Sequence, residues 1–133
     1  MTIIESPEVS INRTPSEVFG FLVDCNNHRH LMPEQVVNWQ STTDTCSFTI
    51  KGTADLSLKI KDTQLWNHIY LEPVGKPPFE FILKWIIESE GETCRVKAIL
   101  EADLNMFLRM VASPPLENFL KYQAEKLKTI LNG

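Results

Sequence analysis

Features that would mark a membrane, secreted or zinc-binding protein are missing from this chain of 133 residues. No apolar run approaches the roughly 20 residues that a membrane-spanning helix needs. The first residues lack the basic segment followed by an apolar segment that is typical of a secretory signal. The spacing of Cys25, Cys46 and Cys94 matches neither a disulfide framework nor a zinc ribbon. We therefore expect a cytoplasmic protein with reduced, mostly buried thiols and no stable membrane insertion.

Positive charge is also scarce. The chain has 13 Lys and Arg residues against 17 Asp and Glu residues, which gives a net charge of -4. The basic residues are scattered, with no cluster beyond three lysines near the C-terminal end. Binding to nucleic acid depends on Lys and Arg that neutralise phosphates, so we expect no nucleic-acid partner.

Sequence motifs of common catalytic and cofactor sites are absent as well. Neither a GxGxxG nor a GxxxxGK[ST] pattern occurs, and no Gly-x-Ser-x-Gly marks a nucleophile. His28 and His30 are two residues apart, so on a helix they would not share a face on which to bind a metal. We therefore assign no cofactor, no metal site and no catalytic residue, and we interpret the two histidines as part of a polar turn between helices.

The composition is that of an ordinary globular protein. Hydrophobic residues make up 43% of the chain and charged residues 23%, without a linker, repeat or low-complexity segment. A chain of this length can bury most of its apolar surface in one core. We expect a single domain over residues 1–133.

Local patterns at the N-terminal end predict a strand followed by two short helices. Residues 3–12 alternate between apolar and polar side chains. Thr14, Pro15 and Glu17 have the spacing of a capping box with proline at the first helical position. The helix is expected to end near Asp24, with a short second helix over residues 28–32.

After Glu34 the apolar residues recur with a period of two, which indicates strands. Each strand has one apolar and one polar face, as in an antiparallel sheet with one face buried. Glu90-Gly91-Glu92 is expected to connect two of the strands as a hairpin. The predicted strands cover residues 37–39, 46–50, 56–60, 65–72, 79–88 and 94–102.

The C-terminal part returns to helical spacing. Apolar residues from Leu116 to Leu131 recur at steps of three and four, which predicts one long amphipathic helix. Residues 104–111 show the same spacing, but Pro114-Pro115 predicts a break or a kink between the two parts. We expect the helix to be interrupted there, so that residues 104–113 form a movable edge of the interior.

Two stretches carry a resemblance to a known superfamily. "VSINRTPSEVFGFLVDCNNHRHLMP" and "LEADLNMFLRMVASPPLENFLKYQAEKL" resemble the opening and closing parts of START-like proteins, also called SRPBCC or polyketide cyclase/dehydrase-like. The resemblance implies an α+β helix-grip fold. In that fold a curved antiparallel sheet of six to seven strands surrounds a long C-terminal helix, with two short helices after strand 1. The superfamily includes lipid carriers, hormone receptors, cyclases and coenzyme Q-binding proteins, so the resemblance specifies a fold more than a function.

If the sheet curves around the helix, its inward positions are apolar, as in a site for an apolar ligand. We therefore predict binding or carrying of a lipid, isoprenoid or polyketide-like molecule between sheet and helix. The same residues would also suit a close-packed core without a cavity. The predicted ligand-binding residues are Trp39, Phe48, Leu58, Tyr70, Phe81, Leu83, Trp85, Val96, Phe107, Met110, Leu116, Phe119 and Leu120.

Two alternatives stay open. An interaction module or homodimer with a filled core would use a surface such as Ile82, Ile86 and Ile99, which fall on the polar face of neighbouring strands. A cyclase- or dehydrase-type enzyme would need a titratable side chain directed inward. The inward positions carry almost none, so we favour binding over catalysis. The remaining candidates for orienting a polar ligand group are Asn67, His68, Tyr70, Asp103 and Arg109.

Overall fold

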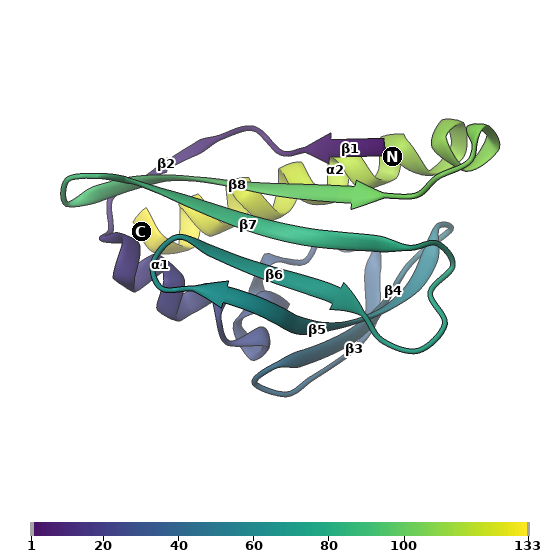
Figure 1. Cartoon of the computed structure of the whole chain (residues 1–133), viewed down its shortest axis with the longest axis horizontal. Coiled ribbons are helices and arrows are strands. Elements are labelled where there is room, and N and C mark those ends of the chain that lie inside the picture. The colour runs from purple at the N-terminus through teal and green to yellow at the C-terminus, as the bar shows by residue number, and fades with distance from the viewer. Residues whose placement is uncertain (1, 133) are drawn as a thin grey trace.

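A computed structural model describes residues 2–132 of the chain. Its strands form one antiparallel sheet in the order β1-β8-β7-β6-β5-β4-β3, and β2 also pairs with β8 (Figure 1). The sheet carries a long C-terminal helix, and two short helices follow β2. The elements are β1 (Thr2–Glu5), β2 (Val9–Ile11), α1 (Pro15–Leu22), the 3₁₀ helix η1 (Cys25–Leu31), β3 (Val36–Ser41), β4 (Thr45–Ile50), β5 (Ala54–Gln64), β6 (His68–Pro73), β7 (Phe81–Glu90), β8 (Thr93–Ala102) and α2 (Met106–Asn132).

The pairing of β7 with β8 shows how the apolar alternation sets the buried face. Leu83 lies opposite Leu100 and Trp85 opposite Ala98, and all four side chains are buried. Because side chains alternate across a strand, the residues between them point to the other face. There Lys84 forms an ion pair with Glu101. The helix-grip architecture predicted from the sequence is confirmed.

The first predicted strand is divided into β1 and β2. Pro7 has no backbone N–H to donate to a neighbouring strand. At Ser6 the backbone N–H donates to the Ala98 carbonyl at 2.8 Å, and the Ser6 hydroxyl accepts from the Ala98 N–H at 2.9 Å. The side chain thus replaces a backbone acceptor at this break, and the division explains why the sheet has eight strands, one more than the predicted maximum.

The helix start predicted at Thr14 is confirmed. The Thr14 hydroxyl accepts a hydrogen bond from the Glu17 N–H at 3.2 Å, and the Glu17 carboxylate accepts one from the Thr14 N–H. The next helix, η1, differs from the prediction because it begins at Cys25 and has 3₁₀ geometry. Asp24 accounts for the earlier start, since its carboxylate caps the Asn26 N–H at 3.0 Å.

α2 is one continuous helix of 27 residues that contains both Pro114 and Pro115. The predicted interruption is therefore wrong. A proline removes the hydrogen bond to the carbonyl four residues earlier, which here belongs to Met110 and Val111. Both of these residues are exposed, so water can solvate the carbonyls that have lost their partners. The helix therefore continues where the sequence pattern suggested a break.

The two ends of α2 are held very differently. At the C-terminal end, Arg13 Nε donates to the Leu131 carbonyl and the Asn12 N–H donates to Asn132 Oδ1, both at 2.7 Å. Before Pro114, the only helical side chain that is fully buried is Ala112. In Figure 1 this first part of α2 projects beyond the end of β8. Between these parts the helix lies across the inner face of the sheet, against β1, β2 and β8.

His28 corrects the interpretation of the histidines as part of a polar turn. Its side chain is buried, with Nε2 2.7 Å from the Leu22 carbonyl and its ring edge-on to Trp85. Burial lowers the pKa of His28 below its usual 6.5, while the bond to Leu22 and the nearby Asp24 oppose this shift. His30, in the same helix, is exposed.

The burial of His28 predicts a loss of stability at mildly acidic pH. In the unfolded chain His28 takes up a proton near pH 6.5, whereas the folded protein takes it up only at lower pH. The free energy of unfolding should therefore be unaffected by His28 above that pH and fall below it, by at most about 1.4 kcal/mol per pH unit. Urea unfolding between about pH 5 and pH 8 measures this slope.

The matched variants are His28→Gln and His30→Gln. Glutamine at position 28 can still donate to the Leu22 carbonyl but does not titrate. We expect a shallower slope below about pH 6.5 for His28→Gln and the wild-type slope for His30→Gln. Equal slopes in all three proteins would contradict the role of His28.

The prolines of α2 predict a helix that can be made more stable. Pro114→Ala restores an N–H for the Met110 carbonyl and removes the clash of the proline ring with the preceding turn. We expect the free energy of unfolding to rise by about 1–3 kcal/mol, the upper value being the full helix penalty of proline. Urea unfolding of Pro114→Ala and of the neighbouring control Ser113→Ala tests this. An equal change in both variants would show that the backbone bond is not the cause.

Candidate functional site

The interior between the sheet and α2 is apolar and nearly filled. Its remaining hollow has a volume of about 10 Å³, close to the space that one water molecule needs. Small-molecule sites are usually roughly 300–1,000 Å³, so the structure shows a packed core in place of a ligand-sized cavity. Side chains of four strands, of α2 and of Phe79 in the loop before β7 line this hollow. They are Phe48, Leu56, Leu58, Phe79, Phe81, Leu83, Leu100, Leu116, Phe119 and Leu120.

Most of the predicted ligand-binding residues lie on this inner face. The hollow itself is lined by seven of them, namely Phe48, Leu58, Phe81, Leu83, Leu116, Phe119 and Leu120. Trp85 and Val96 are completely buried on β7 and β8. Trp39 is half-buried and stacks on Phe48, with the ring centroids 5.4 Å apart. The sequence alternation thus selected these inward residues correctly, whereas their role in binding stays a prediction.

Tyr70 lies on the opposite face, which corrects its predicted inward position. The buried side chains of β6 are Ile69 and Leu71. Tyr70 instead stacks on His68, with ring centroids 4.0 Å apart, and Lys84 Nζ lies 5.0 Å from the centre of its ring. The pairing of β5 with β6 shifts register between Ile60 and Asp62. The extra residue lies in β5, whereas β6 pairs with β7 without a register shift, so the ordinary alternation of β6 places Tyr70 outward.

Phe107 and Met110 are also placed differently from the prediction. Their exposed fractions are 71% and 74%. Because α2 is not interrupted at Pro114, its first turns continue straight beyond the sheet and do not fold back as an edge of the interior. Leu108, between them, is half-buried against the core. In the structure described here Phe107 and Met110 therefore contribute to the surface.

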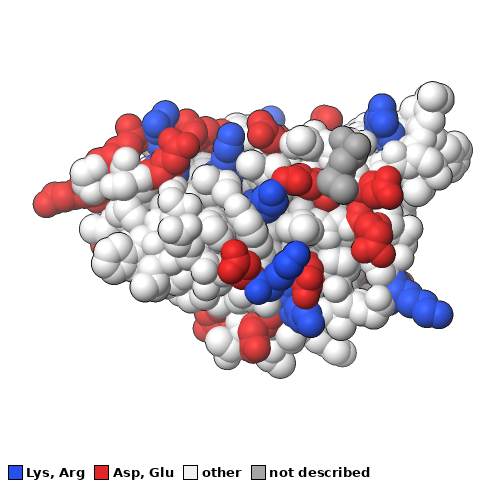
Figure 2. All heavy atoms as spheres, viewed as in Figure 1, with Lys and Arg blue, Asp and Glu red and all other residues white. Residues whose placement is uncertain are grey.

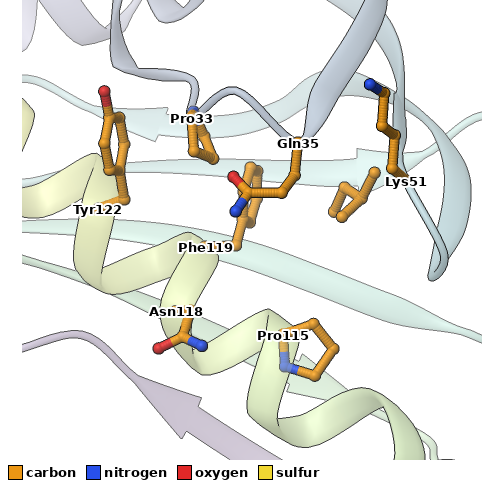
Figure 3. A pocket seen from close by; sticks show the side chains of 8 residues that line it. Pro33, Gln35, Lys51, Pro115, Asn118, Phe119 and Tyr122 are labelled. Atoms are coloured by element: carbon orange, nitrogen blue, oxygen red, sulfur yellow. The ribbon is translucent and has the colours of Figure 1, made fainter.

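A larger pocket opens at the surface beside the apolar interior. Its volume is about 260 Å³, and it lies between the loop before β3, the end of β4 and one face of α2 (Figure 3). The Lys51 N–H donates to the Gln35 carbonyl at 2.9 Å, which ties two sides of the rim together. We call this pocket the mouth; the residues that line it are Pro33, Gln35, Ile50, Lys51, Pro115, Asn118, Phe119 and Tyr122.

Phe119 lines both the mouth and the inner hollow. Its ring is 6% exposed, and its centroid is 5.8 Å from that of Phe48. The Phe119 side chain therefore separates the mouth from the apolar interior, and a change of its rotamer would connect the two spaces. Phe119 was predicted as part of the site, but its position as a partition became visible only in the structure.

The polar groups of the mouth were missed by the sequence analysis. Gln35 and Lys51 lie in connecting segments, where periodicity carries no information. On α2, Pro115, Asn118 and Tyr122 share one face with Phe119 because they follow helical steps of three and four. That spacing was present in the sequence, but Asn118 and Tyr122 lie beside the apolar stripe and were not among the predicted site residues.

Buried polar groups elsewhere in the core do not form a catalytic arrangement with the hollow. Gln123 is buried under α2, with Nε2 3.9 Å from Met32 Sδ. The thiols of Cys25 and Cys46 hydrogen-bond each other, which lowers the pKa of Cys25 and raises that of Cys46. None of these groups, nor His28, lines the hollow or the mouth. Within residues 2–132 no three His, Cys, Asp or Glu side chains are grouped as metal ligands would be.

The polar candidates from the sequence lie away from the interior. His68 bonds to Asp62 at 3.1 Å on the outer face of the sheet, while Asp103 and Arg109 are exposed. Figure 2 shows positive and negative side chains interspersed over this view of the molecule. In the described part of the chain, no helix has the length and apolar character needed to cross a membrane.

No protein-family model matches the chain, and no curated protein matches its sequence. Solved structures are similar over nearly the whole length at low sequence identity. The solution structure of KanY protein has a TM-score of 0.80 at 13% identity and covers 100% of both chains. The dimeric Aha1 from Colwellia psychrerythraea has a TM-score of 0.69 at 12% identity, covering 99% of this chain and 97% of that one.

An enzyme is also among the similar structures. Norcoclaurine synthase from Thalictrum flavum, solved in complex with dopamine and hydroxybenzaldehyde, has a TM-score of 0.69 at 11% identity. The alignment covers 97% of this chain and 85% of that enzyme. At such identities the likeness establishes the fold and leaves the activity open. The chain therefore has the helix-grip fold of START-like proteins, as the resemblance in its sequence implied.

Proposed function

We propose that the protein binds or carries an apolar small molecule, such as a lipid, isoprenoid or polyketide-like compound, in the cytoplasm. The ligand would lie between the sheet and α2. The observation that carries this proposal is that two spaces are adjacent: a mouth of about 260 Å³ lies beside a hollow lined only by apolar side chains, and Phe119 lines both. A hollow whose lining has no ionisable side chain suits binding better than acid-base catalysis.

Because the interior is packed, a side chain or a segment of the protein must move when a ligand enters. Phe119 is one movable part, because a change of its side-chain rotamer opens the partition. The first turns of α2 are the other, since Pro114 and Pro115 remove two backbone hydrogen bonds and this part is held by few buried side chains. The C-terminal end of α2 stays fixed through Asn12 and Arg13.

Native mass spectrometry of freshly purified protein should show a co-purified apolar molecule. The uncharged dye N-phenyl-1-naphthylamine should also bind and fluoresce, and it should raise the melting temperature as any ligand of the native state does. Protein that carries no ligand, takes up no dye and shows no thermal shift with a panel of lipids would overturn the proposal.

The partition predicts a specific effect of Phe119→Leu. A smaller side chain leaves less to displace, so dye affinity should rise about three- to tenfold, corresponding to about 1 kcal/mol. Stability should fall by a similar amount. The control is Leu127→Ala, which truncates a completely buried residue on the same helix away from both spaces. If Leu127→Ala increases dye affinity equally, general loosening of the core is the cause and the partition is not.

The homodimer alternative is favoured by one observation, an apolar surface at the start of α2. Met106, Phe107, Met110 and Val111 are 78%, 71%, 74% and 54% exposed. They lie on one side of the helix, and Figure 2 shows few charges in this corner of the molecule. The isoleucines that first suggested such a surface, Ile82, Ile86 and Ile99, are each half-buried on the outer face of the sheet.

If α2 forms a dimer contact, light scattering should give twice the monomer mass for the wild-type protein. Met110→Asp should give the monomer mass, because a carboxylate in an apolar contact loses its hydration without gaining a partner. The matched control is Glu117→Asp, an exposed position on the same helix, which should keep the wild-type mass. A wild-type monomer would exclude this alternative.

A further inference from the structure

The polar side chains of the mouth have no partners within the protein. Lys51, Gln35, Asn118 and Tyr122 all line it, and no side-chain hydrogen bond or ion pair within residues 2–132 involves any of the four. Lys59, Lys84 and Lys97 on the sheet each pair with a glutamate, whereas Lys61, Lys76 and the lysines of α2 are unpaired in the described residues, as Lys51 is. The rim thus offers one cation and three neutral polar groups that the chain itself does not use.

The charge of the mouth has one sign. Lys51 is its only charged side chain, and no Asp or Glu is among the residues that line it. The chain as a whole has a net charge of -4, so this positive site stands out against an acidic background. One lysine beside the amide of Gln35 suits a group with a single negative charge. A phosphate with two charges is usually bound by several cations or by backbone N–H groups as well.

The floor of the mouth is apolar. Pro33, Ile50, Pro115 and Phe119 form it, and the inner hollow behind Phe119 has apolar side chains only. Figure 3 shows the Gln35 side chain directed toward Phe119, with Lys51 and Tyr122 at opposite ends of the rim. The flexible stem of lysine lets its ammonium group turn over the opening. Polar and apolar parts of a ligand would therefore be bound at different depths.

We propose that the ligand is an amphipathic monocarboxylate, with its carboxylate at the mouth near Lys51 and its hydrocarbon part behind Phe119. This inference rests on the proposed function and adds the chemical class of the ligand. Lys51 supplies the charge, and Gln35, whose backbone is bonded to that of Lys51, donates a hydrogen bond to a carboxylate oxygen. Asn118 and Tyr122 line other parts of the rim. An alcohol of equal chain length has the same hydrocarbon part but lacks the anion.

The test is displacement of bound N-phenyl-1-naphthylamine by three ligands of equal chain length. Decanoate and decylammonium are used below their critical micelle concentrations, and decan-1-ol below its solubility limit. We expect decanoate to displace the dye at a concentration about tenfold lower than decan-1-ol, since a charge-assisted hydrogen bond contributes about that factor. Decylammonium should be the weakest, because its charge has the same sign as that of Lys51.

Three variants distinguish an effect of the Lys51 charge from an effect on the structure of the mouth. Lys51→Met should bring decanoate to the affinity of decan-1-ol and leave decan-1-ol unchanged, whereas Lys51→Arg should keep the preference for decanoate. The matched control is Lys61→Met, which removes the same charge from an exposed position on β5 outside the mouth. It should keep the preference as well.

The outcomes distinguish the two proposals. If neither the dye nor any of the three ligands binds, the proposed function itself is wrong. If decan-1-ol and decanoate bind equally to the wild-type protein, apolar binding stands and the carboxylate class is overturned. If Lys51→Met weakens decan-1-ol as much as decanoate, Lys51 acts through the structure of the mouth and the assigned charge role is wrong.

Discussion

α2 lies across the inner face of a sheet that would otherwise expose a continuous apolar surface to water. Leu116, Leu120 and Leu127 are almost completely buried in this contact, opposite side chains such as Leu83 and Leu100. Burial of a leucine contributes about 1.5–3 kcal/mol, so this contact stabilises the whole chain. The small apolar hollow lies between these two layers, where the proposed ligand would be placed.

α2 is held more firmly at its C-terminal end than at its first turns. Its C-terminal end is fixed to the loop after β2 by hydrogen bonds from Asn12 and Arg13, while its first turns extend past the sheet with four exposed apolar side chains. The two prolines lie between these parts. A helix that is anchored at one end and loosely held at the other can move by small rotations without losing its central leucines. The packed core of the structure and the binding proposal are therefore compatible, provided that the closed arrangement opens.

In the proposed binding mode, the polar rim of the mouth would add specificity to an apolar hollow. Hydrocarbon contacts are nondirectional and discriminate poorly among apolar ligands of similar size. A polar group at the rim therefore decides which end of a ligand faces water and which ligands are excluded. In this chain Lys51, Gln35, Asn118 and Tyr122 occupy that place. Because none of them belongs to the apolar stripes, a substitution there could alter ligand preference with little effect on the core.

The sequence by itself determined the architecture and the inward face. Alternation in β7 and β8, the capping box at Thr14 and the apolar stripe from Leu116 are local periodic signals, and a period of two or 3.6 follows directly from strand and helix geometry. The tertiary structure alone decided the rest. α2 continued through Pro114 and Pro115, and Phe119 came to lie between the mouth and the inner hollow. These features depend on how residues far apart in the chain pack together. A pattern of neighbouring residues contains no information about the distance between Gln35, Lys51 and Asn118 until the fold has brought their elements together.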